Sequence, residues 1–450
     1  MKPRYAQYSM ALAVAAALSG CGSSSSPSTS PGMAAGVVSI PGISSTTTFS
    51  FDLGTFDTST KKYYVTDRTN KSIDVINFNT GATVTQFKPG FTGCGGAYKA
   101  SPSQAVADQN VAIPTCASTA AGIFPSFSVN NDQSGPDGVD VVGANLYVGD
   151  VGNVWILNKT TGALVKKLAT PTPTVRADEG CFDPVDNIYG ISTPGAANPY
   201  MTFIDTTTQT IIAHVVMNQP AGNANPSAGL EACVFDATTG MFFVNNDGST
   251  AHDRGEMDGV PAADIVALKG GVAGATVEFT ALGTGGTNGT VAPKIYNLMS
   301  GANGNCDPTG IALGPGNDIG SMCRQGDIGD QLTFQILDKT TGTVTATLNA
   351  GGADQITYDA ASNNWFLAAS RWTASGNSCG GGSANCVLTP VVTIVNGSSR
   401  TVTARIPSGN NSHSIATGAG VVFSPFTNGP SATAGGVGFP NGGVALFTTQ

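Results

Sequence analysis

The strongest constraint on the fold of this chain is a unit of about forty residues that recurs along it. The clearest copy runs from Gly138 to Thr170 and reads GVDVV, NLYVGD, NVWILNKTTG and ALVKKLAT. Each of these four runs is apolar or alternates in polarity, and turn-forming residues such as Gly, Asn and Asp lie at the junctions. The unit therefore predicts a sheet of four short antiparallel strands.

Six further copies align with this one, and they begin near Asp52, Glu179, Glu231, Thr309, Asp354 and His413. Several contain the segment D/N-x-T-T-G, in which Asp or Asn caps a tight turn and Gly adopts the left-handed conformation that closes a hairpin. A lone four-stranded sheet cannot bury both of its faces, so the copies must stack around an axis. Residues 36–450 are therefore predicted to form one all-β domain, a seven-bladed β-propeller with four-stranded antiparallel blades.

The last copy has only three recognisable strands. The segment Gly36 to Ile40 (GVVSI), close to the other end of the domain, is a candidate for the fourth. We therefore expect the ring to be closed by an N-terminal strand that pairs with the C-terminal blade.

Composition and charge exclude several function classes. With 59 Gly, 25 Pro and only 11% charged residues, the chain is poorly suited to long surface helices. Its net charge of −9 makes nucleic acid an unfavourable partner, because phosphates would be repelled, but leaves cations and neutral ligands open. There is no phosphate loop, HExxH or CxxCH motif, which argues against nucleotide, zinc-protease and cytochrome functions.

The N-terminus has the character of an export signal. Lys2 and Arg4 form a positive segment, and the apolar stretch Met10 to Leu18 is too short to span a membrane. The tetrapeptide LSGC that ends at Cys21 resembles the bacterial lipobox, which implies cleavage before Cys21 and attachment of diacylglycerol to its sulfur. We therefore expect a lipoprotein signal peptide over residues 1–20. The alternative is an ordinary signal peptide followed by a chance cysteine.

Residues 21–35 are rich in Ser, Pro and Gly, a composition typical of a flexible tether between the lipid and the folded domain. Gly22 rather than Asp follows the cysteine, so the resemblance to Gram-negative sorting signals implies an outer-membrane lipid anchor. The exported domain would face the periplasm or the cell surface, and it would contact the membrane through the lipid.

Lipidation of Cys21 leaves eight of the nine cysteines, an even number in a compartment that permits disulfides. Proximity suggests that three bonds each close a short loop, which leaves one pair of distant cysteines: Cys94–Cys116, Cys306–Cys323, Cys379–Cys386 and then Cys181–Cys233. Zinc binding is the alternative, but the chain has no CxxC pair and only three histidines.

Side chains alternate along a strand, so the first and third residues of each innermost strand should point toward the propeller axis. The first positions then form a polar ring, and the third positions form a mostly apolar plug that includes Cys181 and Cys233. The ring holds Asp137, Glu179, Glu231, Asp354 and His413. Four crowded carboxylates would repel one another unless their pKa values rise or a divalent cation binds them. Oxygen ligands favour Ca²⁺ or Mg²⁺, while His413 widens the choice toward Mn²⁺ or Zn²⁺. The alternative is a channel mouth of solvated polar residues or of acids that accept backbone N–H bonds.

Long insertions are predicted to share one face of the ring, whereas short turns occupy the other face, which we call the turn face. We call these insertions the crown: Lys88–Gly135, Asp247–Ala262, Gly270–Pro308, Asn317–Gln331, Arg371–Thr389 and Pro425–Gly442. Loops of this length are usually functional or disordered, so the crown is a candidate binding surface, and decoration without a ligand is the alternative. The fourth-blade loop also carries an acidic cluster that lacks EF-hand spacing and is predicted to be solvated: Asp247, His252, Asp253, Glu256, Asp258 and Asp264.

Two family resemblances follow from these segments. The stretch YYVTDRTNKSIDVINFNTGATV resembles the YVTN-type β-propeller repeat of exported bacterial proteins, which implies the fold but no particular activity. The segments EGCFDP and LEACVFD are similar to those of gluconolactonase and regucalcin-like propellers, whose divalent metal is held by carboxylates at the channel mouth. That second resemblance implies metal ligands at Glu179 and Glu231.

Two functions fit the sequence. The first is a non-catalytic envelope lipoprotein that binds a protein, a glycan or another extracellular ligand through the crown. The second is a metal-dependent lactonase or hydrolase in which Asp137, Glu179, Glu231 and Asp354 hold the cation and His413 moves protons. The sequence favours the first and leaves the ligand and the enzyme question open.

Overall fold

The computed structural model describes the residues 34–43, 49–80, 82–92, 135–217, 227, 229–249, 251–252, 254–283, 291–298, 306–323, 331–377, 387–427, 433–434, 437–438 and 442–449. They belong to one compact unit, Pro31–Gln450. The predicted signal peptide and Cys21 lie outside the described residues. Among the described residues, no helix has the length and apolar character needed to cross a membrane.

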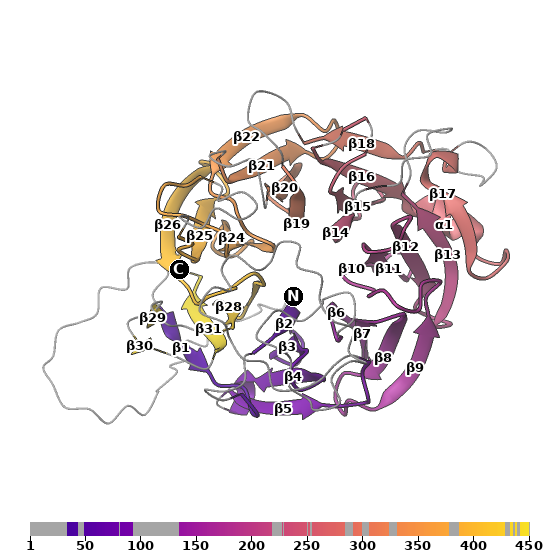
Figure 1. Cartoon of the computed structure of the whole chain (residues 1–450). Coiled ribbons are helices and arrows are strands. Elements are labelled where there is room, and N and C mark those ends of the chain that lie inside the picture. Colours follow the sequence, from indigo (N-terminus) through magenta and orange to yellow (C-terminus); the bar gives the residue numbers. More distant parts are fainter. Residues whose placement is uncertain are drawn as a thin grey trace, which may run out of the picture. The chain divides into compact units, whose positions relative to one another are not determined.

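Seven four-stranded antiparallel arrays surround a central axis, which confirms the predicted seven-bladed β-propeller (Figure 1). In the first six blades the strands follow sequence order from the axis outward. Blades 1 to 3 contain β2 (Phe51–Asp57), β3 (Lys62–Asp67), β4 (Ser72–Asn77) and β5 (Thr83–Phe87); β6 (Val139–Val142), β7 (Asn145–Asp150), β8 (Asn153–Asn158) and β9 (Leu164–Ala169); and β10 (Gly180–Asp183), β11 (Ile188–Thr193), β12 (Tyr200–Asp205) and β13 (Thr210–Val216).

The remaining blades follow the same plan, with one exception at the end of the chain. Blades 4 to 6 contain β14 (Leu230–Asp236), β15 (Met241–Asn246), β16 (Glu256–Pro261) and β18 (Lys294–Asn297); β19 (Pro308–Leu313), β20 (Asp318–Cys323), β21 (Thr333–Asp338) and β22 (Val344–Asn349); and β23 (Ile356–Asp359), β24 (Asn364–Ala369), β25 (Val391–Asn396) and β26 (Thr401–Pro407). Blade 7 contains β27 (Ala416–Gly418), β28 (Val421–Phe426), β31 (Gly443–Thr448) and β1 (Ala34–Val38).

The outer strand of blade 7 comes from the N-terminal part of the chain. Strand β1 pairs antiparallel with β31, with Val37 opposite Ala445 and Val38 opposite Val444. It begins at Ala34, two residues before the predicted segment, and ends before Ile40. A short hairpin of β29 (Thr433–Ala434) and β30 (Val437–Gly438) lies in the connection between β28 and β31.

The D/N-x-T-T-G segments that begin at Asn158 and Asp338 form the predicted turns between third and fourth strands, whereas the one that begins at Asp236 joins the first and second strands of blade 4. The side-chain oxygen of Asn158 accepts hydrogen bonds from the amides of Thr160 and Thr161, both at 3.0 Å. Gly162 closes this turn with a φ of 71°. Because the side chain satisfies the turn amides, the chain reverses within a few residues on the turn face.

The prediction that every long insertion lies on the crown face is wrong for blade 4. Residues 262–293 join its third and fourth strands, and in a four-stranded blade that connection emerges on the turn face. They contain α1 (Ala262–Leu268), β17 (Ala275–Glu278) and η5 (Phe279–Ala281). Strand β17 pairs in parallel with β13 and adds a fifth strand to blade 3.

Residues 256–261, assigned from sequence to a crown loop, form strand β16. Met257 and Val260 are fully buried, and so are Glu256 and Asp258 of the same strand. The predicted Asn317–Gln331 insertion likewise contains β20. These strands were not predicted because their acidic and glycine residues interrupt the alternation of apolar and polar residues that is typical of a strand.

Candidate functional site

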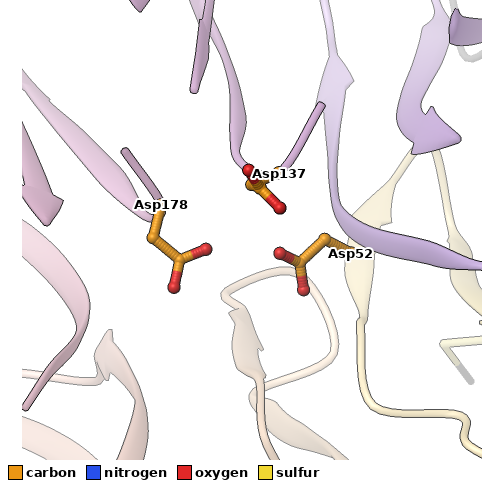
Figure 2. A group of neighbouring side chains, drawn as sticks. All are labelled: Asp52, Asp137 and Asp178. Atoms are coloured by element: carbon orange, nitrogen blue, oxygen red, sulfur yellow. The ribbon is translucent and has the colours of Figure 1, made fainter. Parts of the chain in front are cut away.

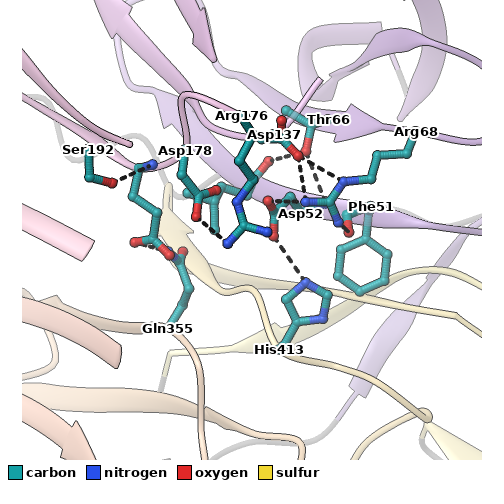
Figure 3. A network of polar contacts seen from close by, with 12 residues as sticks. Phe51, Asp52, Thr66, Arg68, Asp137, Arg176, Asp178, Ser192, Gln355 and His413 are labelled. Carbon is teal, nitrogen blue, oxygen red and sulfur yellow. Dashed lines mark hydrogen bonds and ion pairs between the residues drawn. The ribbon is translucent and has the colours of Figure 1, made fainter. Parts of the chain in front are cut away.

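The candidate site is the mouth of the central channel on the crown face, which we call the axial mouth. Most of its members lie at or just before the inner strands or in the connections that lead to them, whereas Arg68 lies between β3 and β4: Asp52, Arg68, Asp137, Arg176, Asp178, Glu179, Gln355 and His413. Figure 3 labels all of these residues except Glu179. Strand β2 has a register shift between Phe51 and Gly54, and β14 has one between Leu230 and Cys233. Such bulges redirect side chains, here at Asp52 and at the position of Glu231.

Arg68 directly follows β3 and joins two blades. Its Nε and Nη2 donate to Oδ1 of Asp137 at 3.0 and 2.7 Å, and its Nη1 donates to the Phe51 carbonyl at 2.9 Å. Nη2 also donates to Asp52. The Arg68 side chain is only 2% exposed, so its charge is balanced by the two carboxylates rather than by water.

A second cation and a histidine extend the network. Nη2 of Arg176 lies 2.6 Å from Oδ2 of Asp178, and Nε2 of His413 lies 3.4 Å from Oδ1 of Asp52. The His413 ring stacks on Phe51 with a centroid distance of 4.5 Å. Burial acts to lower the pKa of His413, but the hydrogen bond to Asp52 and the charges of Asp354 and Asp52 outweigh it and raise that pKa. The carboxylates around His413 thus favour its protonated form.

Oxygen atoms of Asp52, Asp137 and Asp178 lie within 4.8 Å of one another, a spacing that a metal could use (Figure 2). Arg68 and Arg176 are already paired with these same carboxylates, so two guanidinium groups supply the positive charge that a cation would bring. One buried oxygen, Oδ2 of Asp137, has no hydrogen-bond partner. The donor set therefore fits an ion-pair network better than a metal centre, with Asp137 as its least satisfied member.

Glu179 reaches across the mouth to another blade. Its Oε2 accepts a hydrogen bond from Nε2 of Gln355 at 2.9 Å, which links blade 3 to blade 6. Burial is the largest cause that raises the pKa of Glu179 well above its ordinary value. The negative charges of nearby acids raise it further, namely those of Asp178, Glu231, Asp354 and Asp52.

The pKa values of the other acids in the mouth are shifted in different directions. Burial raises the pKa of Asp178 to about 7 although Arg176 opposes the shift. Burial also raises the pKa of Asp137 well above its usual range. Burial would raise the pKa of Asp52 as well, but Arg68 and His413 outweigh it and hold that pKa low. The pKa shifts of the carboxyls in the mouth therefore run in both directions.

A cavity of about 140 Å³ lies on the axis, lined by inner-strand residues that include Asp140, Glu179, Cys233 and Gln355. Asp140 accepts a hydrogen bond from the Tyr189 hydroxyl at 2.8 Å, and burial raises its pKa to about 7. Ligand pockets usually measure about 300–1,000 Å³. This space suits a few water molecules rather than an organic substrate.

Two of the predicted cysteine pairs lie at disulfide distance. Cys181 and Cys233 occupy equivalent positions in adjacent blades, with sulfur atoms 2.09 Å and Cα atoms 5.6 Å apart. Cys306 and Cys323 have sulfur atoms 2.11 Å apart. The remaining cysteines lie outside the described residues: Cys94, Cys116, Cys379 and Cys386.

The structure brings the predicted ring residues to one place but assigns them different neighbours. Asp137 pairs with Arg68, His413 contacts Asp52, and Glu231 and Asp354 lie near enough to raise the pKa of Glu179. Metal binding by these residues stays a prediction. Sequence reasoning missed two acids and both arginines: Asp52, Asp178, Arg68 and Arg176. Only Asp178, adjacent to Glu179, carried a signal that strand alignment could have found.

The acidic cluster of blade 4 is not the solvated loop that the sequence predicted. Glu256 and Asp258 lie on β16 and are fully buried. Asn246 Nδ2 donates to both of them, at 3.2 and 2.8 Å, and His252 Nδ1 lies 2.6 Å from Glu256 Oε2. Asp264, on α1, is also fully buried. Hydrogen-bond partners from β15 and the following loop replace the water that these acids would otherwise need.

No protein family matches the sequence, and no curated protein matches it. A chain of a mitotic checkpoint complex is similar in structure, with a TM-score of 0.52 and 11% identity over 96% of this chain and 98% of its own. A chain of hydrazine synthase from Kuenenia stuttgartiensis reaches a TM-score of 0.53 at 12% identity, over 86% and 96% of the two chains. At such identities the likeness shows the fold alone.

Proposed function

We propose that this chain is an exported lipoprotein, anchored through Cys21 in the outer membrane, that uses its crown face to bind a protein, a glycan or another extracellular ligand. One observation carries the proposal: long connections accumulate on the crown face, between β5 and β6, β24 and β25, and β28 and β31. Most third-to-fourth-strand connections on the turn face are tight turns. Long connections positioned by a rigid scaffold are where binding residues concentrate.

The axial mouth supports a surface function. Its ion pairs and the contact between Glu179 and Gln355 occupy the mouth, and the cavity below is small. A partner would therefore contact the rim and the crown instead of entering the channel. The resemblance to the YVTN-type repeat is compatible with this role, since that repeat occurs in exported proteins with unrelated activities.

Site-specific photo-cross-linking in cells tests the binding proposal. A photoreactive amino acid is placed at Ala251 or Ala374 on the crown face and, as controls, at Thr160 or Thr208 on the turn face; all four positions are exposed. We expect a cross-linked adduct of discrete mass from the crown positions only. Equal adducts from both faces, or none from the crown, would contradict the proposal.

The lipid anchor has its own test. Replacing Cys21 by Ala removes the sulfur that would carry diacylglycerol, so the protein should lose incorporated radiolabelled palmitate and move from the membrane to the soluble fraction. A Cys181→Ser, Cys233→Ser variant serves as the cysteine control and should keep its label. A Cys21→Ala protein that stays membrane-bound would overturn the anchor.

A metal-dependent lactonase or hydrolase is the second candidate, favoured by the unsatisfied Oδ2 of Asp137 and by the resemblance of EGCFDP and LEACVFD to gluconolactonase-like propellers. Lactone hydrolysis that requires Ca²⁺ or Mn²⁺, and that the Glu179→Gln and Glu231→Gln variants abolish, would support this function. Activity that persists unchanged in both variants would exclude these ligands.

A further inference from the structure

Lysines on the turn face join neighbouring blades in a recurring way. Lys159 is the second residue of the blade 2 turn, and its Nζ lies 2.8 Å from Oδ2 of Asp57, at the end of the first strand of blade 1. Lys339 holds the same turn position in blade 5 and lies 2.7 Å from Oδ1 of Asp236, at the end of the first strand of blade 4. At both junctions, the turn lysine of one blade thus pairs with the aspartate at the end of the first strand of the preceding blade.

At a third junction, a lysine from the neighbouring blade contacts the aspartate of the turn itself. Asp205 begins the turn between β12 and β13, and its Oδ1 accepts hydrogen bonds from the amides of Thr207 and Thr208 at 2.8 and 3.1 Å. Its second oxygen, Oδ2, lies 3.2 Å from Nζ of Lys269, which follows α1 in blade 4. The chain therefore shows how the free oxygen of a turn aspartate receives an ammonium group.

The junction between blades 5 and 6 lacks both the turn lysine and the strand-end aspartate that pair at the first two junctions. In the blade 6 turn, Asn396 to Arg400, the lysine position is held by Gly397, and the first strand of blade 5 ends in Leu313 instead of an aspartate. A groove of about 670 Å³ opens there, which we call the turn-face groove. Its lining includes Asn317, Asp318, Asp338, Gly397 and Arg400.

The groove contains two carboxylates, and one oxygen of Asp338 is able to accept a further hydrogen bond. Both oxygens of Asp318 accept from Nη2 of Arg400, at 2.8 and 3.1 Å. Oδ1 of Asp338 accepts from the amides of Thr340 and Thr341, whereas Oδ2 has only a long contact of 3.4 Å with Nδ2 of Asn317. Hydrogen bonds from Thr340 lower the pKa of Asp338 to about 2, so the carboxylate stays ionised at neutral pH. In the described part of the chain, no cation pairs with Asp338.

We propose that the turn-face groove binds a lysine side chain of a partner protein, whose ammonium group takes the place at Asp338 that Lys269 takes at Asp205. The groove is large enough for a short extended peptide segment around that lysine. A chain with net charge −9 would also attract a basic partner. This surface lies on the face opposite the crown and is independent of the crown's ligand.

Saturation-transfer difference NMR on the full-length protein tests this proposal with the peptide acetyl-Gly-Lys-Gly-amide. We expect saturable contact of the lysine methylene protons and a loss of affinity of about threefold to fivefold in Asp338→Asn, as for one exposed ion pair. The substitution keeps the turn, because Asn158 and Asn396 cap the equivalent turns in blades 2 and 6. Asp205→Asn is the matched control and should bind as the wild type does.

Three results would overturn the proposal. One is the absence of saturable binding. Another is equal binding by the Asp338→Asn variant or by the Nε-acetylated peptide, which lacks the ammonium charge. A third is equally tight binding of 1,5-diaminopentane, because the occupant would then be a free amine and not a partner's lysine.

Discussion

Arg68 is the residue on which the axial mouth depends most. Its buried guanidinium group balances Asp52 and Asp137, which come from different blades. Arg68→Met should therefore remove the main positive charge beside these two buried carboxylates, with only His413 left in contact with Asp52, and lower the free energy of unfolding by about 3–5 kcal/mol. Urea denaturation measures this, with Arg400→Met as the control, because its partly exposed pair with Asp318 should cost about 0.2–1 kcal/mol. A loss no larger than that of the control would show that the mouth carboxyls do not need Arg68.

The raised pKa of Glu179 makes a pH-dependent prediction. A carboxyl whose pKa is raised by folding contributes stability that is complete below its unfolded pKa and is lost as pH rises through its folded pKa. Asp178 and Asp140, each with a pKa of about 7, should act in the same direction. The wild-type melting temperature should accordingly fall between pH 5 and pH 8.

Glu179→Gln removes the titrating group and can keep the contact with Gln355. Its melting temperature relative to wild type should therefore increase steadily from pH 5 to pH 8. Glu278→Gln, at an exposed position on β17, is the control and should follow the wild type. A constant difference between Glu179→Gln and wild type would mean that Glu179 is ionised throughout.

At this scale, the sequence predicted which acids meet but not what neutralises them. Strand alternation places Glu179 and Glu231 toward the axis because equivalent positions in a repeat share a direction. Arg68 and Arg176 lie in irregular connections, where no period indicates the direction of a side chain. The two arginines of the site therefore could not be predicted from the sequence.

At the scale of elements, the turn-face lysines explain part of the cohesion between blades. Lys339 and Asp236 have side chains that are only 5% and 3% exposed, and contacts with Lys339, Thr238 and Thr239 lower the pKa of Asp236 to about 2 against the effect of burial. Lys339→Met should lower the free energy of unfolding by about 1.5–3 kcal/mol, the range for a hydrogen bond to a charged group. A double-mutant cycle with Asp236→Asn measures the coupling, and additive effects would show that the pair contributes nothing.

Element prediction succeeded where the repeat was regular and failed where blade 4 departs from it. The copy at Gly138 to Thr170 gave all four strands because apolar residues alternate and turn residues separate them. In β16, Glu256 and Asp258 occupy the alternate positions of a buried strand, and only their hydrogen bonds to Asn246 make this tolerable. Strand β17 was not predictable, since its pairing with β13 depends on a neighbouring blade.

For the whole molecule, the seven-fold repetition was sufficient to predict the architecture, because sheets with two apolar faces can bury them only in a ring. The distribution of insertions between the two faces was predictable only in part. Connection lengths in blade 4 depend on which segments form strands, and the sequence prediction assigned residues 256–261 to a loop although they form β16. The propeller thus presents two distinct faces, a crown face with the axial mouth and a turn face with the turn-face groove.

We expect the buried Arg68 and Arg176, rather than a bound cation, to neutralise the carboxylates of the axial mouth. Elemental analysis by mass spectrometry of the purified full-length protein, after dialysis against excess Ca²⁺ and Mn²⁺ and then against metal-free buffer, tests it most directly. We expect less than stoichiometric metal in the wild type and no change in Asp137→Asn or Glu179→Gln. One divalent ion per chain that disappears in either variant would contradict it.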